Sequence, residues 1–352
     1  SDQLLGGVAL ASYYRSGFGE NLTSGRDTSD KDILSGRVSA EWLISDDWRL
    51  KFNADTTIDN SNVRGARRLT DSLLTGEKPL NNPHDVRSNL SDSNYVKNDG
   101  SAATVAGQIT DRTQLLLITA YREGKTRSNT DFDLLAVSAF DAPAQYDDHQ
   151  FSEELRLNFT GDKWNAVSGI YYIDSSACGS FDVIIGVANT IQTISGCTKT
   201  KSSSLYGHIS FAIADDVNLS AGLRYNNDWK DASVFQSAVV NSGSPIISTD
   251  FSNDENWSHL SPKIGVDYQL RTNLLLYASV SEGFKSGGFN MRANAARETA
   301  TGRDATQPFD EETLKTLELG VKSQWLDKQL AGNFTLFYSR YDDIQITTSR
   351  FY

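Results

Sequence analysis

The chain has 352 residues, a formal net charge of -12 and a hydrophobic content of 38%, and its mean hydropathy is -0.42. No stretch reaches the roughly 18 uninterrupted apolar residues that a transmembrane helix requires, and the acidic balance disfavours nucleic acid as a partner. These values exclude a helical membrane protein. They do not exclude a transmembrane β-barrel, whose strands need only about 9 to 11 residues with every second one apolar.

Segments along the chain alternate between apolar and polar residues with the period of two that a β-strand imposes. Clear examples cover residues 34–44, 49–58, 151–159 and 217–226. Each predicted strand therefore has one apolar and one polar face. We count about thirteen such segments, and an odd number indicates part of a larger barrel, because closed bacterial barrels have an even number of strands. The segments begin near residues 3, 33, 48, 102, 113, 150, 164, 202, 217, 256, 273, 313 and 329.

Very short turns and long polar loops follow one another between these segments. The loops have roughly 17 to 40 residues, and this inequality is typical of barrels with short periplasmic turns and long extracellular loops. The sequence therefore predicts an all-β fold, an antiparallel up-and-down transmembrane β-barrel. A soluble β-sandwich also alternates, but it usually has Greek-key crossings and tighter loops at both ends. The short turns are Ser45–Asp47, Thr110–Arg112, Gly161–Lys163, Ala214–Asp216, Leu270–Thr272 and Leu326–Lys328.

Charged residues gather on the polar faces of the predicted strands. We expect them to hydrogen-bond to water or to a domain inside the barrel, and direct contact with a substrate is the alternative. The lumen-facing candidates are Arg37, Glu41, Glu154, Arg156, Arg224, Lys263 and Glu318.

Tryptophans lie close to the ends of the predicted strands. Trp42, Trp48, Trp164 and Trp325 are within a few residues of a short turn, whereas Trp257 adjoins a long loop. An amphipathic ring is stable at the headgroup level of a bilayer, so we expect these five residues at the two membrane interfaces. The alternative is the general preference of aromatic residues for strands.

The two cysteines, Cys178 and Cys197, both fall in the predicted long loop between Asp174 and Lys201. A pair in an outer-surface loop has access to an oxidising compartment. We therefore expect a disulfide that holds this loop in a defined shape over the barrel mouth.

Catalytic and metal-binding patterns are missing from the sequence. The four histidines are isolated, and neither HExxH nor CxxC occurs. Paired acidic residues such as Asp147 and Asp148 suggest calcium, but they lack the spaced ligands of an EF-hand and fit tight turns better. We expect no enzyme activity, no cofactor and no metal site.

Three stretches of the chain resemble the barrel of TonB-dependent outer-membrane receptors. They are NLLLYASVSEGFKSGGFN at residues 273–290, QFSEELRL at residues 150–157, and residues 309–322, where Phe309-Asp310-Glu311-Glu312 leads to Leu317-Glu318-Leu319-Gly320-Val321-Lys322. The glycines near Lys285 do not form a P-loop, because the GxxxxGK[ST] order and a following helical pattern are both missing.

The resemblance implies an outer-membrane location in a Gram-negative bacterium and energised uptake of a ferric siderophore or similar large nutrient. Such receptors have about 22 strands around a plugged lumen, and their plug contacts the TonB complex. We therefore expect residues 1–352 to be an internal part of the barrel domain, starting at Ser1 and ending at Tyr352, with plug and C-terminal strands absent from the chain. A passive pore or surface-binding barrel without TonB coupling is the alternative.

The outer loops carry the residues expected to meet ligands. Arg64, Arg67 and Arg68 lie in the longest loop, where guanidinium groups suit an anionic siderophore or the phosphates of lipopolysaccharide; a solvated loop surface is the alternative. Outer-membrane lipid and lipopolysaccharide are the other expected partners. The full set of ligand or loop candidates is Arg64, Arg67, Arg68, Lys285, Asn290 and Arg292.

Overall fold

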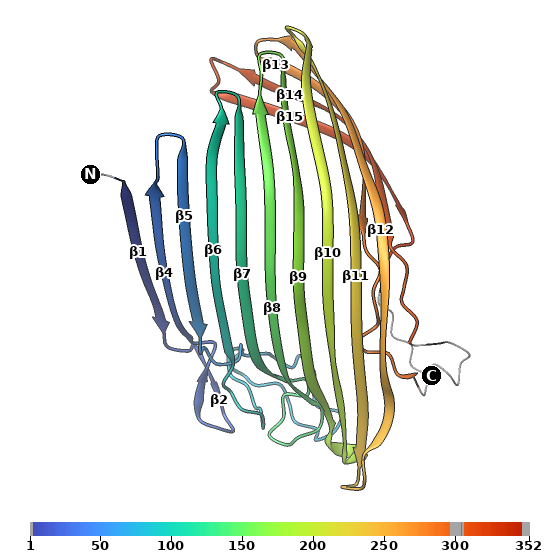
Figure 1. Ribbon diagram of the computed structural model, residues 1–352. Helices are drawn as coiled ribbons and strands as arrows, with labels where there is room; N and C mark the ends of the chain where they lie inside the picture. Colours follow the sequence, from blue (N-terminus) through green and yellow to red (C-terminus); the bar gives the residue numbers. More distant parts are fainter. Residues whose placement is uncertain (1–2, 296–303, 305, 347–352) are drawn as a thin grey trace.

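The computed structural model describes residues 3–295, 304 and 306–346. Thirteen antiparallel strands form one sheet, in which each strand pairs with the next one along the sheet, and two short strands form a second sheet (Figure 1). This confirms the predicted all-β, up-and-down architecture. Ser1 and Tyr352, the predicted ends of this part of the barrel, lie outside the described residues.

Within the described part of the chain, no helix is long and apolar enough to cross a membrane.

The strand bounds agree closely with the sequence pattern at the end of the sheet that has the short turns. The large sheet contains β1 (Leu4–Arg15), β4 (Lys31–Leu43), β5 (Trp48–Asp59), β6 (Tyr95–Thr110), β7 (Thr113–Asp131), β8 (Asp141–Thr160), β9 (Trp164–Ile185), β10 (Thr190–Ala214), β11 (Val217–Val240), β12 (Ile246–Arg271), β13 (Leu274–Lys285), β14 (Glu312–Trp325) and β15 (Leu330–Asp342). The small sheet contains β2 (Gly19–Asn21) and β3 (Arg26–Thr28), and the 3-10 helix η1 (Gly186–Ala188) joins β9 to β10.

Short turns occupy one end of the large sheet, at the top of Figure 1, and the longest connections lie at the opposite end. We call the second end the outer end. Two connections there, β9–β10 and β11–β12, are much shorter than the sequence predicts, because β9 to β12 continue as paired strands of 22 to 26 residues. The predicted long loops at residues 174–201 and 226–256 are therefore wrong.

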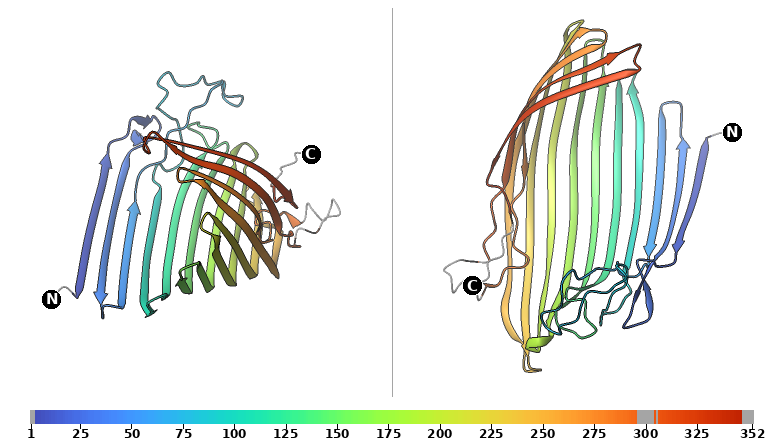
Figure 2. Two further views of the ribbon diagram at one scale, coloured as in Figure 1. Left: turned by 90° about the horizontal axis from the view of Figure 1, so that it is seen from above. Right: turned by 180° about the vertical axis from the view of Figure 1, so that it is seen from behind.

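The large sheet curls into an open trough, and β1 and β15 form its free edges in the described structure (Figure 2). One surface of the sheet, the apolar face, carries exposed side chains such as Leu34, Leu155 and Leu223. The other surface, the polar face, carries their charged sequence neighbours. Buried hydrophobic side chains are few in the described structure, and the cluster of Ala232, Trp257 and Phe289 lies near the outer end.

Candidate functional site

The hydrogen-bond register places all seven lumen-facing candidates on the polar face. Residues opposite one another in a ladder share a face, and so do residues two apart along one strand. Glu41 lies opposite Lys51, and the same row continues through β6 and β7 to Glu154. The row of Arg156 reaches Arg224 in the same way. The register of the neighbouring strands puts three further candidates on the same face: Arg37, Lys263 and Glu318.

Several of these charges are engaged by neighbouring aromatic side chains. The hydroxyl of Tyr206 donates a hydrogen bond to Glu154, and the guanidinium carbon of Arg224 lies 5.6 Å from the centroid of the Tyr206 ring. The hydroxyl of Tyr277 donates to Glu318 Oε1 at 2.8 Å. Hydrogen bonds and a cation–π contact therefore hold Glu154, Arg224 and Glu318 in place on the polar face.

A chain segment folds against the polar face at the outer end. This inner segment, residues 286–295, leaves β13 and lies over β10 to β12. Gln236 Nε2 donates to the carbonyl oxygen of Ala293 at 2.7 Å, and Thr249 Oγ1 donates to the same oxygen at 3.1 Å. Gln236 and Thr249 are only 1% and 2% exposed. Buried amide and hydroxyl groups that are fully paired fix a segment in one position, because an alternative position would leave them unpaired.

Aromatic packing completes this contact. Phe289 of the inner segment meets Trp257 edge-on, with ring centroids 6.3 Å apart, and Lys230 Nζ donates to the carbonyl oxygen of Gly287 at 2.6 Å. Trp257 is 9% exposed and lies opposite the buried Asp228 on the polar face. Its predicted place at a membrane interface is therefore wrong, because its ring is covered by the inner segment.

The other predicted interface tryptophans stand near the short turns. Trp42 and Trp325 are each 49% exposed on the surface of the sheet. Trp164 stacks on Phe159 with ring centroids 3.9 Å apart, and Trp48 is half-buried. Their contact with lipid headgroups stays a prediction.

A histidine connects β12 to the end of β13. His259 Nε2 lies 3.3 Å from Glu282 Oε1, and His259 Nδ1 lies 3.0 Å from Glu311 Oε1. The ring also stacks on Phe284 at a centroid distance of 4.4 Å. Two carboxylates and an aromatic face thus hold the two ends of the connection that contains the inner segment.

The loop cations differ in how free they are. Arg64 and Arg67 are exposed, whereas Arg68 donates to the backbone oxygens of Glu77 and Leu134 at 3.1 and 3.4 Å. Arg68 therefore pins the long connection between β5 and β6, so it does not belong to a solvated loop surface. Its contact with a ligand stays a prediction.

The remaining loop candidates belong to β13 and the inner segment. Lys285, Asn290 and Arg292 are exposed, and the Arg292 guanidinium lies 5.3 Å from the centroid of the Phe181 ring. These three side chains border the polar face at the outer end, so a solute that enters there would pass them.

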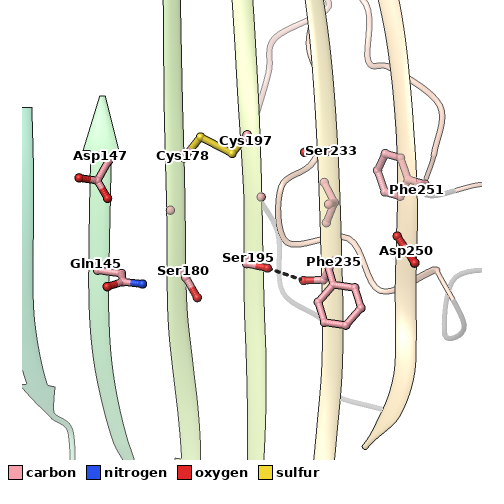
Figure 3. Close-up of a pocket in the computed structure, with 13 residues that line it drawn as sticks. Gln145, Asp147, Cys178, Ser180, Ser195, Cys197, Ser233, Phe235, Asp250 and Phe251 are labelled. Atoms are coloured by element: carbon pink, nitrogen blue, oxygen red, sulfur yellow. Dashed lines mark hydrogen bonds between the residues drawn. A yellow bond between two sulfur atoms is a disulfide. The ribbon is translucent and has the colours of Figure 1, made fainter. Parts of the chain in front are cut away.

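The predicted disulfide is present, but its setting differs from the expectation. Cys178 and Cys197 lie directly opposite each other in β9 and β10, and Figure 3 shows their bond crossing two neighbouring strands. Their register row also contains Asp147 and Ser233, on the same surface of the sheet as the apolar residues of these strands. The disulfide therefore ties an extended hairpin, and the expected loop over the mouth is wrong because both cysteines are in strands.

A single curved sheet with one apolar and one polar face, and with unequal ends, is the wall of a transmembrane β-barrel. A model of the family described as TonB dependent receptor-like, beta-barrel matches residues 54–352. The chain belongs to this family of receptors. The family's members are outer-membrane proteins of Gram-negative bacteria and are not enzymes.

Solved structures share the fold. The ferric yersiniabactin uptake receptor FyuA from Yersinia pestis is 18% identical with a TM-score of 0.77, over 99% of this chain and 51% of that one. The ferric-catecholate import receptor Fiu from K12 E. coli is 16% identical with a TM-score of 0.72, over 97% and 55%. The chain thus spans about half the length of these structures.

The pesticin receptor of Yersinia pestis is 24% identical over 151 residues, which are 43% of this chain and 20% of that protein. The sequence pattern predicted the polar face but neither the inner segment nor the cluster of Asp131, Asp133 and Asp141. The repeated small and aromatic residues of Ser286-Gly287-Gly288-Phe289 were the available signal for a segment that packs closely.

Proposed function

We propose that this chain supplies barrel wall and outer ligand-contact surface to a receptor for energised uptake of a ferric siderophore or a similar large nutrient. The single observation that carries the proposal is the inner segment, which holds cationic and amide side chains at the outer end of the polar face in a chain of this family. Anionic iron chelates suit such a border, because guanidinium and ammonium groups bind their oxygens.

The proposal assigns different roles to the two sets of candidates. Arg64, Arg67, Lys285, Asn290 and Arg292 would contact the ligand as it enters. The charged residues of the polar face would hydrogen-bond to water and to a plug inside the barrel, and that plug would contact the TonB complex. Lipid and lipopolysaccharide would cover the apolar face. The names of the relatives support an iron chelate: one is a ferric yersiniabactin uptake receptor and another a ferric-catecholate import receptor.

Uptake of radioactive iron by cells tests the energised function. Cells with the gene should accumulate a labelled ferric siderophore under iron limitation, and cells without the gene, or without TonB, should not. Uptake that continues without TonB would support the passive pore. Equal growth and equal uptake with and without the gene, across catecholate, hydroxamate and carboxylate siderophores, would refute the siderophore ligand.

Loop variants test where the ligand binds. Replacing both Arg64 and Arg67 by alanine should weaken siderophore binding by at least about ten-fold, since even one lost charge-assisted hydrogen bond costs about 1.5 to 3 kcal/mol. Lys163→Ala is the matched control, because Lys163 is an exposed cation in a short turn at the other end of the sheet. Equal affinity of the two variants would remove the arginines from the ligand site.

A further inference from the structure

Three aspartates meet in the connection between β7 and β8. Asp131 ends β7 and lies opposite Asp141, which begins β8. Asp133 lies between them in the sequence. One carboxylate oxygen from each of the three lies within 4.8 Å of the others. Three acidic groups therefore share one small volume at the outer end, far along both strands from the short turns.

Local hydrogen bonds hold these carboxylates in place. Asp133 Oδ1 accepts from the backbone N–H of Leu135 at 2.9 Å, and Asp133 Oδ2 accepts from that of Ala139 at 3.0 Å. Asp131 Oδ1 accepts from the backbone N–H of Leu134 at 2.6 Å. The short loop therefore fixes two carboxylates by its own backbone before any ligand is present.

Asp141 is tied to a different part of the chain. Its Oδ2 accepts from Ser138 Oγ at 2.6 Å and from Asn89 Nδ2 at 3.0 Å. Asn89 belongs to the long connection between β5 and β6. The aspartate cluster is consequently the point at which two outer connections of the sheet meet.

Two oxygens of the cluster have no donor. Asp131 Oδ2 and Asp141 Oδ1 are buried without a hydrogen-bond partner, and Asp141 as a whole is 0% exposed. Among the described residues, no lysine, arginine or histidine forms an ion pair with any of the three carboxylates. Arg68 approaches this loop, but it donates to the backbone oxygens of Asp133 and Leu134, at 3.5 and 3.4 Å. Buried carboxylate oxygens without a donor or a counter-charge are strongly unfavourable.

We propose that Asp131, Asp133 and Asp141 bind one Ca²⁺ ion, which fastens the connection between β7 and β8 to the connection between β5 and β6. The ion would supply the positive charge that the buried oxygens lack. Ca²⁺ accepts carboxylates in a flexible geometry with about six to eight oxygen ligands, and water or backbone oxygens would complete the shell. Mg²⁺ fits less well, because it demands near-octahedral geometry and keeps several of its waters.

The location favours this ion as well. Extracellular calcium modules bind with Kd values of about 10⁻⁴ to 10⁻³ M, a range that is set by the charge and rigidity of the ligand set. The site needs no siderophore, so it does not depend on the proposed function. Its sequence spacing of two and eight residues does not match an EF-hand, and the fold brings the three residues together.

Equilibrium dialysis with radioactive calcium tests the site. The protein is folded in detergent, treated with EDTA and dialysed against increasing Ca²⁺. The wild type should bind one ion with a Kd of about 10⁻⁴ to 10⁻³ M, whereas Asp131→Asn and Asp141→Asn should each bind at least about ten-fold more weakly. Asp71→Asn is the matched control, because Asp71 is an exposed acid of the β5–β6 connection outside the cluster. It should bind as the wild type does.

A second measurement needs no variant. Protease cleavage within residues 132–140 of the wild type should slow at least about ten-fold in about 10 mM Ca²⁺ relative to EDTA, since an ion bound only by the ordered loop suppresses its opening by a factor of 1 + [Ca²⁺]/Kd. Calcium-independent cleavage, or the absence of saturable binding by the wild type, would overturn the proposal. Binding by folded Asp141→Asn that equals binding by Asp71→Asn would overturn it too.

Discussion

Gly287 marks the closest approach of the inner segment to the sheet. A methyl group at this position would lie 2.3 Å from Trp257 Nε1 and 2.2 Å from the carbonyl oxygen of Phe309. Both distances are too short for contact, so Gly287→Ala should displace the segment at a cost of about 1 to 3 kcal/mol. Hydrogen exchange of residues 286–295 should rise in this variant.

Gly283→Ala is the control for that measurement, because an added methyl group there meets no atom within 4 Å. It changes the same residue type four positions away on β13. If both variants protected residues 286–295 equally well, the close packing of Gly287 would not be what holds the segment.

Asp131 gives the outer end a dependence on pH. Burial raises the pKa of Asp131 from 3.8 to about 6. The folded loop therefore binds a proton that the unfolded chain would release, and the stabilising effect is complete below about pH 4 and disappears as the pH rises to about 6. In EDTA, protection of residues 132–140 from hydrogen exchange, corrected for the intrinsic rate, should fall across this range.

Asp131→Asn should abolish that pH dependence, since the neutral amide does not titrate. Asp133, Asp141 and Arg68 surround the same loop and remain in the variant. An unchanged slope between pH 4 and pH 6 in Asp131→Asn would assign the effect to one of these neighbours. Added calcium should flatten the slope of the wild type, because it favours the ionised carboxylate.

Single residues also show where sequence reasoning reached its limit. Alternation along each strand was sufficient to put Glu154 and Arg224 on the polar face of its own strand, because a strand has only two faces. It could not show that Trp257 is covered, since the covering residue Phe289 is distant in sequence and belongs to another connection. Likewise, Arg68 is partly buried because it donates to the backbone oxygen of Leu134, which is 66 residues away in the sequence.

At the scale of elements, the sequence predicted where strands begin near the short turns but not where they end. The outer parts of β9 and β10 pair from Asp174 opposite Lys201 to Ile185 opposite Thr190. Many of these side chains are polar, so the apolar alternation that a bilayer imposes is missing there. Ladder hydrogen bonds form regardless of side-chain polarity, and strands beyond the membrane therefore carry little sequence signal.

The disulfide should stabilise this outer extension locally. Closing a loop of 19 residues contributes about 3 kcal/mol in the chain-entropy model. A double Cys178→Ser, Cys197→Ser variant should therefore raise hydrogen exchange at residues 178–197 by up to about two orders of magnitude. Residues 164–174 of the same hairpin should keep their protection, because strand pairing on both sides holds them. Equal loss of protection in both parts would contradict this local role.

At the scale of the whole molecule, the apolar face changes character along one register row. Towards the short turns it carries Leu155, Leu205 and Leu223, which are 39%, 62% and 50% exposed. At the row of Lys201 and Trp229 it becomes charged, and the Trp229 indole donates to Asp254 Oδ2 at 3.0 Å. An aromatic residue beside charges is typical of the boundary between hydrocarbon and headgroups. We therefore expect the outer extension that carries the disulfide to stand beyond the bilayer.

Arginine substitutions on either side of this row test the boundary. Leu223→Arg puts a charge on the apolar face about midway between the short turn before Val217 and the row of Trp229, and it should destabilise the folded barrel by about 2 to 4 kcal/mol. Ser233→Arg lies on the same face of the same strand beyond the row, so it should cost no more than about 1 kcal/mol. Urea unfolding of the protein in lipid vesicles measures both values. Similar costs would mean that the bilayer also covers the row of Ser233, and the disulfide, which shares that row, would then lie in lipid.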